Sequence, residues 1–363
     1  MKDWKASFLP FVLGFVYVWL LKFGYQPDAT TLFLCFLSLA TTMGFASFGY
    51  LMNEFFDQKE DEKAGKINKL KGVSIPVVGL LFGLSLAVML LPWLVLPFDE
   101  WSLILIALEL GSFLVYSIPP LRLKRFPLPA CLLDTAYAYV WPMALSMHTF
   151  AIQAPWQVHS WFNFLLAALF FIGFRNIVLH QIKDAVADFN SGRKTLPLVV
   201  GANKTYRILQ LVLALEILLF TLFLLFFHRY GSLFALSYSI YLVWKYNSIQ
   251  KGLSPLPSQA FQVFYLSDLF YQLWLPMLII GVLVKQDVRW LYLFLFHLLV
   301  LAFNFRRLIL GGELAEIYHK TILHGISMVV NTIIYYVFRM FGVDLKLEKK
   351  SALDYLNSKK RKQ

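Results

Sequence analysis

Long apolar segments recur along the whole chain, and they constrain its fold more than any other feature of the sequence. Each is about 20 residues long, the length that an α-helix needs to cross the hydrocarbon core of a bilayer. Hydrophobic residues make up 59% of the 363 residues and charged residues only 15%, whereas soluble domains carry about 25% charged residues. A water-soluble core cannot absorb that much apolar surface at this length. The sequence therefore predicts an all-α, polytopic transmembrane helical bundle.

The apolar segments predict ten membrane spans. These are at 7–24, 30–52, 74–97, 101–120, 129–150, 160–183, 205–228, 231–249, 262–285 and 290–310. The first run leads on without a small-residue cleavage site, so we expect it to be retained as a span rather than removed as a signal peptide. Residues 320–341 are also apolar enough to span, but an eleventh span would export the basic tail. We therefore expect 317–341 to lie along or dip into the membrane interface.

The distribution of basic residues predicts the orientation. Lys and Arg gather in the connections at 53–73, 121–128 and 184–204, whereas 98–101 and 151–160 hold none. Basic loops face the cytoplasm in membrane proteins, so we expect these three connections and both termini to be cytoplasmic, in a bacterial inner membrane. The same loops account for the net charge of +12, which therefore does not indicate nucleic-acid binding.

The chain has two cysteines, and both lie in apolar stretches. Cys35 and Cys131 give no support for a structural disulfide or a cysteine-based metal site.

Two polar stretches at the ends of apolar segments share one spacing. They read NEFFDQKEDEKAGK at 53–66 and HQIKDAVADFNSGR at 180–193, and matched positions lie 127 residues apart. The matched pairs are Asn53 and His180, Asp57 and Asp184, Asp61 and Asp188, Gly65 and Gly192, and Lys66 and Arg193. Acids alone could simply solvate a helix end. Two such series of polar residues with a four-residue spacing, here called the first and second ladder, indicate a duplicated motif.

A four-residue spacing places side chains along one side of a helix, about 6 Å apart with a drift of about 40° per step. Carboxylates stacked in this way repel one another unless a cation neutralises them. Oxygen ligands suit Mg²⁺, which binds through a few carboxylates together with substrate phosphates. Two facing ladders therefore predict Mg²⁺ ions around a diphosphate, with metal ligands Asn53, Asp57, Asp61, Asp184 and Asp188.

These motifs resemble those of the UbiA-type intramembrane prenyltransferases. The first ladder is similar to the Asn-x3-Asp-x3-Asp motif of that superfamily, and KDAVADFNSGRKTLPLVVG at 183–201 looks like its second Asp-rich motif with the TLP-x3-G ending. A third stretch, YSIPPLRLKRFP at 116–127, is similar to one seen in chlorophyll-synthase-like and tocopherol-pathway members. The resemblance covers residues 10–285. His180 departs from it, because many members carry Asp or Asn there.

The resemblance implies a domain plan. We expect a UbiA-like nine-helix core at 1–286, one extra span and an interfacial helix at 287–345, and a basic cytoplasmic tail at 346–363. Family proteins usually have nine spans, so the resemblance assigns no role to the C-terminal extension.

The resemblance also implies a chemistry. Mg²⁺ would turn an allylic polyprenyl diphosphate into a leaving group, the C–O bond would break, and a lipophilic or aromatic acceptor would attack the cation. Aromatic faces near the cytoplasmic ends of spans would shield that cation from water. These rings belong to Phe55, Phe56, Tyr116, Tyr137, Tyr139 and Trp141. On this reading Asn53, Asp57, Asp61, Asp184 and Asp188 are the catalytic residues.

Further polar residues are substrate-binding candidates. They are Tyr116, Arg122, Lys124, Arg125, Arg175, Asn176, His180, Lys183 and Arg193. Lys124 is the first choice for the diphosphate, although plain loop charge also explains Arg122, Lys124 and Arg125. Arg175 lies at membrane depth, where charges are usually functional or paired, so it either lines the substrate pocket or pairs with Glu109 or Glu216. His180 is a nitrogen ligand, a donor to diphosphate or a base.

Asp268 and Gln272 share a face of the ninth span, where they either line the cavity or join helices by a hydrogen bond. Together with Arg175 they favour a polar acceptor pocket, and so a transferase, over a membrane terpene cyclase on the same scaffold. A transporter or lipid-binding scaffold is the more distant alternative, because transporters need ionisable groups near the bilayer midplane rather than at its cytoplasmic boundary.

Overall fold

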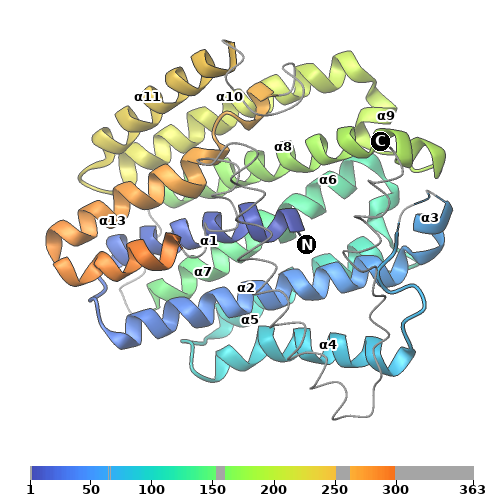
Figure 1. The fold of residues 1–363 in the computed structure, drawn as a ribbon, viewed down its shortest axis with the longest axis horizontal. Coiled ribbons are helices and arrows are strands. Elements are labelled where there is room, and N and C mark those ends of the chain that lie inside the picture. Colours follow the sequence, from blue (N-terminus) through green and yellow to red (C-terminus); the bar gives the residue numbers. More distant parts are fainter. Residues whose placement is uncertain (1, 64, 66, 153–159, 251–261, 299–363) are drawn as a thin grey trace, which may run out of the picture. The chain divides into compact units, whose positions relative to one another are not determined.

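The computed structural model describes residues 2–63, 65, 67–152, 160–250 and 262–298. The chain divides into two compact units, Met1–Leu301 and Ala302–Gln363, and the second lies outside the described residues. All regular structure in the described part is helical, which confirms the predicted all-α class. In the first unit the long helices run side by side as a bundle (Figure 1).

The helices of the first half come from both long spans and short connections. They are α1 (Lys2–Phe23), α2 (Ala29–Phe56), α3 (Gln58–Lys63), α4 (Ile75–Leu90), η1 (Leu91–Leu94), α5 (Glu100–Ser117), η2 (Leu123–Arg125), α6 (Pro127–Thr135), η3 (Ala136–Val140) and α7 (Trp141–Ala151). Those of the second half are α8 (Ser160–Asn190), α9 (Leu196–Val200), α10 (Ala202–Phe227), α11 (Gly231–Gln250), η4 (Val263–Tyr265), η5 (Phe270–Trp274), α13 (Leu275–Gln286) and η6 (Val288–Trp290).

Helix α1 forms the centre of the core. Its residues from Phe11 to Leu20 are all buried, and it packs against α13, α7 and η5. The stretch is apolar on every side of the helix, and a helix of that kind is stable only when it is surrounded. The other main contacts pair α8 with α10 and α2 with α4.

Side-chain caps fix where two of the spans begin. The Asp28 carboxylate accepts a hydrogen bond from the Thr31 N–H at 2.7 Å before α2. Asp99 and Ser102 form a reciprocal capping box at the start of α5. Such caps satisfy backbone donors that have no partner inside the helix.

Six described helical segments are long and apolar enough to cross a membrane, so the chain is an integral membrane protein. They are Ala29–Phe56, Ile75–Leu94, Glu100–Ser117, Trp161–Asn190, Ala202–Phe227 and Val263–Gln286. The other predicted spans before residue 286 also coincide with helices, namely α1, the run from α6 to α7, and α11. The span at 290–310 is described only to residue 298, and the helix expected at 317–341 and the tail lie outside the described residues.

Large apolar side chains remain exposed along the outer helices. On α10 and α11 they include Leu211, Leu218, Phe226, Leu236 and Ile240. Exposed apolar side chains in this number suit contact with lipid rather than water.

Two spans contain a π-helical segment. The first, η3, lies between α6 and α7, and the second, η5, precedes α13. The helix after each segment has a proline near its start, Pro142 and Pro276 respectively. Since proline lacks a backbone N–H, a widened turn before it accommodates the missing hydrogen bond.

Candidate active site

The first acidic ladder crosses a break between two helices. Asn53 belongs to α2, Asp57 follows its last residue, and Asp61 belongs to α3. The backbone N–H of Asp57 donates to the Asn53 carbonyl at 2.9 Å, and that of Asp61 donates to the Asp57 carbonyl at 2.8 Å. The four-residue spacing is therefore kept by the backbone even though the single continuous helix expected from the sequence is interrupted at Asp57.

The outer members of this ladder are held by residues that the sequence did not single out. Ser117, the last residue of α5, donates from Oγ to Asn53 Oδ1 at 2.8 Å. Asn68 donates from Nδ2 to Asp61 Oδ2 at 3.0 Å. Ser117 lies inside the third motif, which was a signal for it. Asn68 lies in a lysine-rich connection with no motif.

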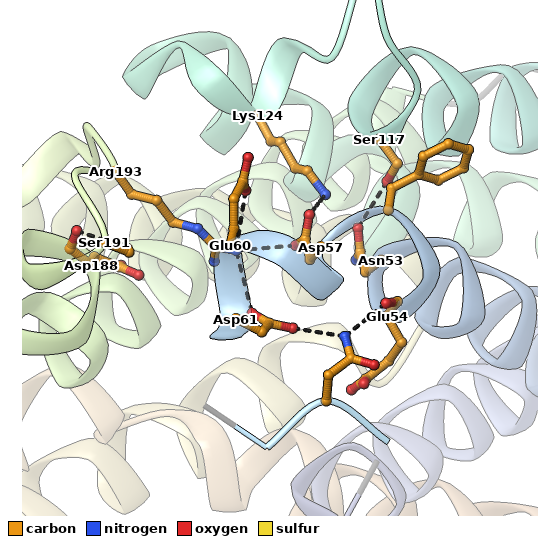
Figure 2. A network of polar contacts seen from close by, with 12 residues as sticks. Asn53, Glu54, Asp57, Glu60, Asp61, Ser117, Lys124, Asp188, Ser191 and Arg193 are labelled. Atoms are coloured by element: carbon orange, nitrogen blue, oxygen red, sulfur yellow. Dashed lines mark hydrogen bonds and ion pairs between the residues drawn. The ribbon is translucent and has the colours of Figure 1, made fainter. Parts of the chain in front are cut away.

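Asp57 is the meeting point of the three motifs (Figure 2 shows the contacts with Lys124 and Arg193). Its Oδ1 atom lies 2.9 Å from Arg122 Nη2 and 2.5 Å from Lys124 Nζ, and its Oδ2 lies 3.4 Å from Arg193 Nη2. Arg122 and Lys124 come from the connection after α5, where Lys124 lies in η2, and Arg193 comes from the loop after α8. Segments far apart in sequence therefore converge on one carboxylate.

The turn after α8 directs Arg193 toward the first ladder. Gly192 has a φ of 73°, in the left-handed region that glycine adopts without strain, and it ends the helix. The Arg193 N–H then donates to the Asp188 carbonyl at 2.9 Å. The Arg193 Nη2 lies 3.3 Å from Glu60 Oε2 and 3.4 Å from Asp61 Oδ1. Burial lowers the pKa of Arg193, but the neighbouring carboxylates outweigh burial and raise it above the usual value.

Glu60 is an acid of this site that sequence reasoning missed. Its Oε1 lies 2.8 Å from Arg122 Nη1, so it contacts both arginines of the site. The position 127 residues later is Ala187, and the comparison of the two stretches therefore gave no signal for it. Its place in the acidic run of 60–62 was the only hint.

Lys124 lies between Asp57 and an aromatic ring. Its Nζ is 5.7 Å from the centre of the Tyr116 ring, and that ring meets Tyr137 edge-on with centroids 5.4 Å apart. Burial lowers the pKa of Lys124, although the charge of Asp57 and its contact with the amine act in the opposite direction. A cation–π contact between Lys124 and Tyr116 therefore lies beside the first ladder.

The second ladder is less enclosed at its start than at its end. His180 is exposed, and its Nε2 lies 3.9 Å from Asp184 Oδ2. Asp188 is buried, at 5% exposure. Arg125 is exposed, and Lys183 places its amine 5.2 Å from the centre of the Tyr265 ring.

Arg175 and Asn176 lie deeper on α8 and contact other partners. Arg175 is fully buried, with Nε 2.7 Å from Glu216 Oε2 and Nη2 2.7 Å from Asp268 Oδ1. Asn176 donates from Nδ2 to the Tyr139 hydroxyl at 2.8 Å. Of the two acids considered as partners of Arg175, the structure pairs it with Glu216.

The donor chemistry of the first ladder fits Mg²⁺, because an amide oxygen and carboxylates lie at successive turns of one segment. In the described part of the chain these carboxylates contact arginine and lysine, and no group of three or more His, Cys, Asp and Glu side chains is gathered as a metal cage. The ligand types are therefore right, while the acids are neutralised by side-chain cations.

A sequence model of the UbiA prenyltransferase family matches residues 7–274. A search of curated proteins found no match.

Among solved structures, the apo structure of a UbiA homologue from Aeropyrum pernix K1 is similar, with 18% identity and a TM-score of 0.55 over 77% of this chain and 98% of that chain. A UbiA homologue from Archaeoglobus fulgidus bound to DMAPP and Mg²⁺ has 19% identity and a TM-score of 0.53, over 77% and 96% of the two chains. A UbiA homologue from Archaeoglobus fulgidus bound to GPP and Mg²⁺ has 18% identity and a TM-score of 0.51, over 77% of this chain and 100% of that chain. These similarities show that the chain shares the fold of these proteins.

Proposed function

Because the chain belongs to the UbiA prenyltransferase family, we propose that it is a Mg²⁺-dependent intramembrane prenyltransferase. It transfers the prenyl group of an allylic polyprenyl diphosphate to a lipophilic or aromatic acceptor. The observation that carries the proposal is the convergence of three motifs on Asp57, which brings carboxylates and cations together at the end of a membrane-embedded bundle. The structural relatives bound to GPP or DMAPP with Mg²⁺ support the same class of substrate.

The residues that would hold Mg²⁺ are Asn53, Asp57 and Asp61 on one side and Asp184 and Asp188 on the other. When bound, Mg²⁺ draws negative charge from the diphosphate and makes it a better leaving group. Ser117 and Asn68 hold the amide of Asn53 and the carboxylate of Asp61 in fixed orientations.

The cations of the site would bind the leaving diphosphate. Arginine suits this task because its planar guanidinium matches phosphate oxygens with two parallel hydrogen bonds. Arg193 and Lys124 approach from two different connections between long helices. The bond between the allylic carbon and the diphosphate oxygen breaks, and the diphosphate leaves with the electron pair. An electron pair of the acceptor forms the new bond to that carbon, and the acceptor loses one proton.

The aromatic side chains next to Lys124 would stabilise the allylic cation and exclude water. Tyr137 lies against Tyr116 and against Phe113, with centroids 5.4 and 4.6 Å away. The faces of such rings attract a cation most strongly where water is absent.

Two substitutions test the assignment of the acids. Asp57→Asn and Asp184→Asn keep the side-chain size and remove the charge, and we expect each to lower Mg²⁺-dependent consumption of the prenyl diphosphate by about 100-fold or more. Glu62→Gln is the matched control, because Glu62 is exposed and pairs with Lys71. Normal turnover in both Asp variants would contradict the proposal.

A second assay separates transfer from cyclisation. Membranes that contain the protein are incubated with geranylgeranyl diphosphate and Mg²⁺, with and without lipid extract as the source of acceptor, and the products are identified by mass spectrometry. A transferase gives a prenylated lipid that needs the extract. A cyclic hydrocarbon or alcohol formed without any acceptor would mean that the site catalyses a terpene-cyclase reaction instead of prenyl transfer.

The site would face the cytoplasm of a bacterium, with the protein in the inner membrane. The basic connections at 53–73, 121–128 and 184–204 support this orientation, because lysine- and arginine-rich loops stay on the cytoplasmic side. The catalytic core would comprise 1–286, with 287–345 and 346–363 as additions to it.

A further inference from the structure

Six charged side chains of the candidate active site neutralise one another. The acids are Asp57, Glu60 and Asp61, and the cations are Arg122, Lys124 and Arg193. The contacts between them range from 2.5 to 3.4 Å. Every cation of the group touches at least one acid, and every acid touches at least one cation.

A group of charges balanced in this way disfavours the binding of either Mg²⁺ or diphosphate alone. A metal ion that binds the carboxylates must displace arginine or lysine, and the displaced cations then lose their partners in a largely buried site. A diphosphate that binds the cations leaves the carboxylates unpaired in the same way. Breaking one side of a buried ion pair is costly because the remaining charge is left uncompensated. Metal and diphosphate arriving together supply a new partner for each side.

We propose that Mg²⁺ and the diphosphate bind as a coupled pair, and that Arg193 is the group that exchanges partners, passing from the carboxylates of the first ladder to the diphosphate. The inference rests on the proposed function and concerns the order of events at that site.

Arg193 is better suited to exchange than Arg122. The Arg122 side chain is 9% exposed and uses both Nη atoms, on Asp57, Glu60 and the Phe56 carbonyl. The Arg193 side chain is 27% exposed, and its contacts with Asp57, Glu60 and Asp61 are all made by Nη2. Arg122 therefore keeps α3 in place while Arg193 changes partner.

Glu60 sets the strength of this coupling. It contributes one of the three balancing negative charges and contacts both arginines, although it is outside the four-residue ladder. Removing its charge leaves an excess of positive charge, which favours an anion and disfavours a metal ion. Removing the charge of Arg193 has the opposite effect on both ligands.

The experiment measures each ligand alone and both together on the purified full-length chain in detergent. Mn²⁺ replaces Mg²⁺ and is followed by electron paramagnetic resonance. Inorganic pyrophosphate is followed by calorimetry, first with EDTA and then with Mn²⁺, after subtraction of the complex that the two form in solution. We expect pyrophosphate to raise the Mn²⁺ affinity by about 10-fold or more, within the usual range of coupling between ligands.

Two variants with opposite expected signs test the roles of the side chains. Arg193→Gln should raise the affinity for Mn²⁺ alone and lower that for pyrophosphate alone, each by about five-fold or more. Glu60→Gln should do the reverse. Both should reduce the coupling. Glu62→Gln, which makes the same charge change on the same helix, should leave all three values unchanged.

The outcomes separate this inference from the proposed function. Coupled binding in the unaltered chain with opposite shifts in the two variants supports it. Binding of both ligands without coupling, or weaker Mn²⁺ binding in Arg193→Gln, overturns the exchange but leaves the proposed function in place. Failure of the unaltered chain to bind either ligand, alone or together, overturns both.

Discussion

The side chain of Asn68 makes three hydrogen bonds that fasten the loop after α3 to the first ladder. Its Nδ2 donates to the Glu54 carbonyl at 2.7 Å and to Asp61 Oδ2 at 3.0 Å, and its Oδ1 accepts from the Leu70 N–H at 3.0 Å. Asn68 is buried, at 7% exposure, so these bonds face little competition from water.

Asn68→Ala should lower the free energy of unfolding by about 1–3 kcal/mol, because a buried carbonyl and a carboxylate lose their donor. It should also raise the Mg²⁺ concentration needed for half-maximal activity, since Asp61 is no longer oriented. Thermal unfolding in detergent and a Mg²⁺ titration measure the two effects. Asn203→Ala, at an exposed position of α10, is the control and should change neither. An Mg²⁺ response equal to that of the unaltered chain would limit Asn68 to a structural role.

At the residue scale, spacing was sufficient to find the ladders but not their partners. The repeat at four residues identifies Asp57 and Asp184 because helical geometry translates directly into sequence spacing. The contact of Arg193 with Asp57 depends on how α8 packs against the rest of the bundle, and a single sequence does not encode that packing in any local pattern. The role of Glu60 could not be predicted from the sequence, because it depends on contacts with two segments that are distant along the chain.

At the element scale, α2 and α4 approach closely at Gly44. A Cβ added there would lie 2.4 Å from the Met89 nitrogen and 2.5 Å from its Cα, so backbone would have to move. Gly83 on α4 has no atom within 4 Å of the corresponding position. Substitutions at Gly44 and Gly83 therefore separate the effect of helix packing from the intrinsic effect of glycine in a helix.

Gly44→Ala should destabilise the protein by about 1–3 kcal/mol, as overpacking of a close contact does. Gly83→Ala should be neutral or stabilising by up to about 1 kcal/mol, because alanine favours the helix. Melting temperatures of the two purified variants compare the effects directly. Equal melting temperatures would mean that α2 and α4 are free to separate at this point.

The ion pairs of Arg175 connect three separate segments of the second half of the chain. Arg175 on α8 holds Glu216 on α10 and Asp268 just before η5, and the Tyr271 hydroxyl donates to Glu216 Oε1 at 3.0 Å. A charge at this depth is costly unless it is paired in this way.

Arg175→Met should lower the free energy of unfolding by about 3–5 kcal/mol, because two acids are left without their cation. Arg207→Met, at an exposed position of α10, should change it by less than about 0.5 kcal/mol. Thermal unfolding and the yield of monodisperse protein report the difference. A stable Arg175→Met protein with altered acceptor preference would instead assign Arg175 to the substrate pocket.

At the scale of the whole molecule, two exposed acids mark opposite ends of the bundle. Glu62 lies on α3 beside the candidate active site, and Glu100 lies at the start of α5, before the chain returns to that end. The two native cysteines, Cys35 and Cys131, are fully buried, so they give little background in labelling experiments.

Cysteine labelling tests the orientation predicted from basic loops. In intact cells a membrane-impermeant maleimide should label Glu100→Cys, whereas Glu62→Cys should react only after the membrane is made permeable. The reverse pattern would place the site on the outer face of the membrane.

The overall architecture followed from composition because lipid leaves few choices for the backbone. Each span must satisfy its own hydrogen bonds, so a long apolar segment predicts a helix before any packing is known. The positions of α2 and α8 could be predicted on that basis. The break at Asp57 could not, because it comes where α2 gives way to the short polar helix α3, whose conformation depends on its contacts.

The π-helical segments η3 and η5 act as one-residue insertions inside two continuous spans, since each turn there holds about one residue more than an α-turn. One residue rotates an α-helix by about 100°. An alignment with a relative whose span is α-helical throughout must therefore open a gap within 136–140 or 270–274. Without that gap, every later residue of the span is compared with one on a different side of the helix.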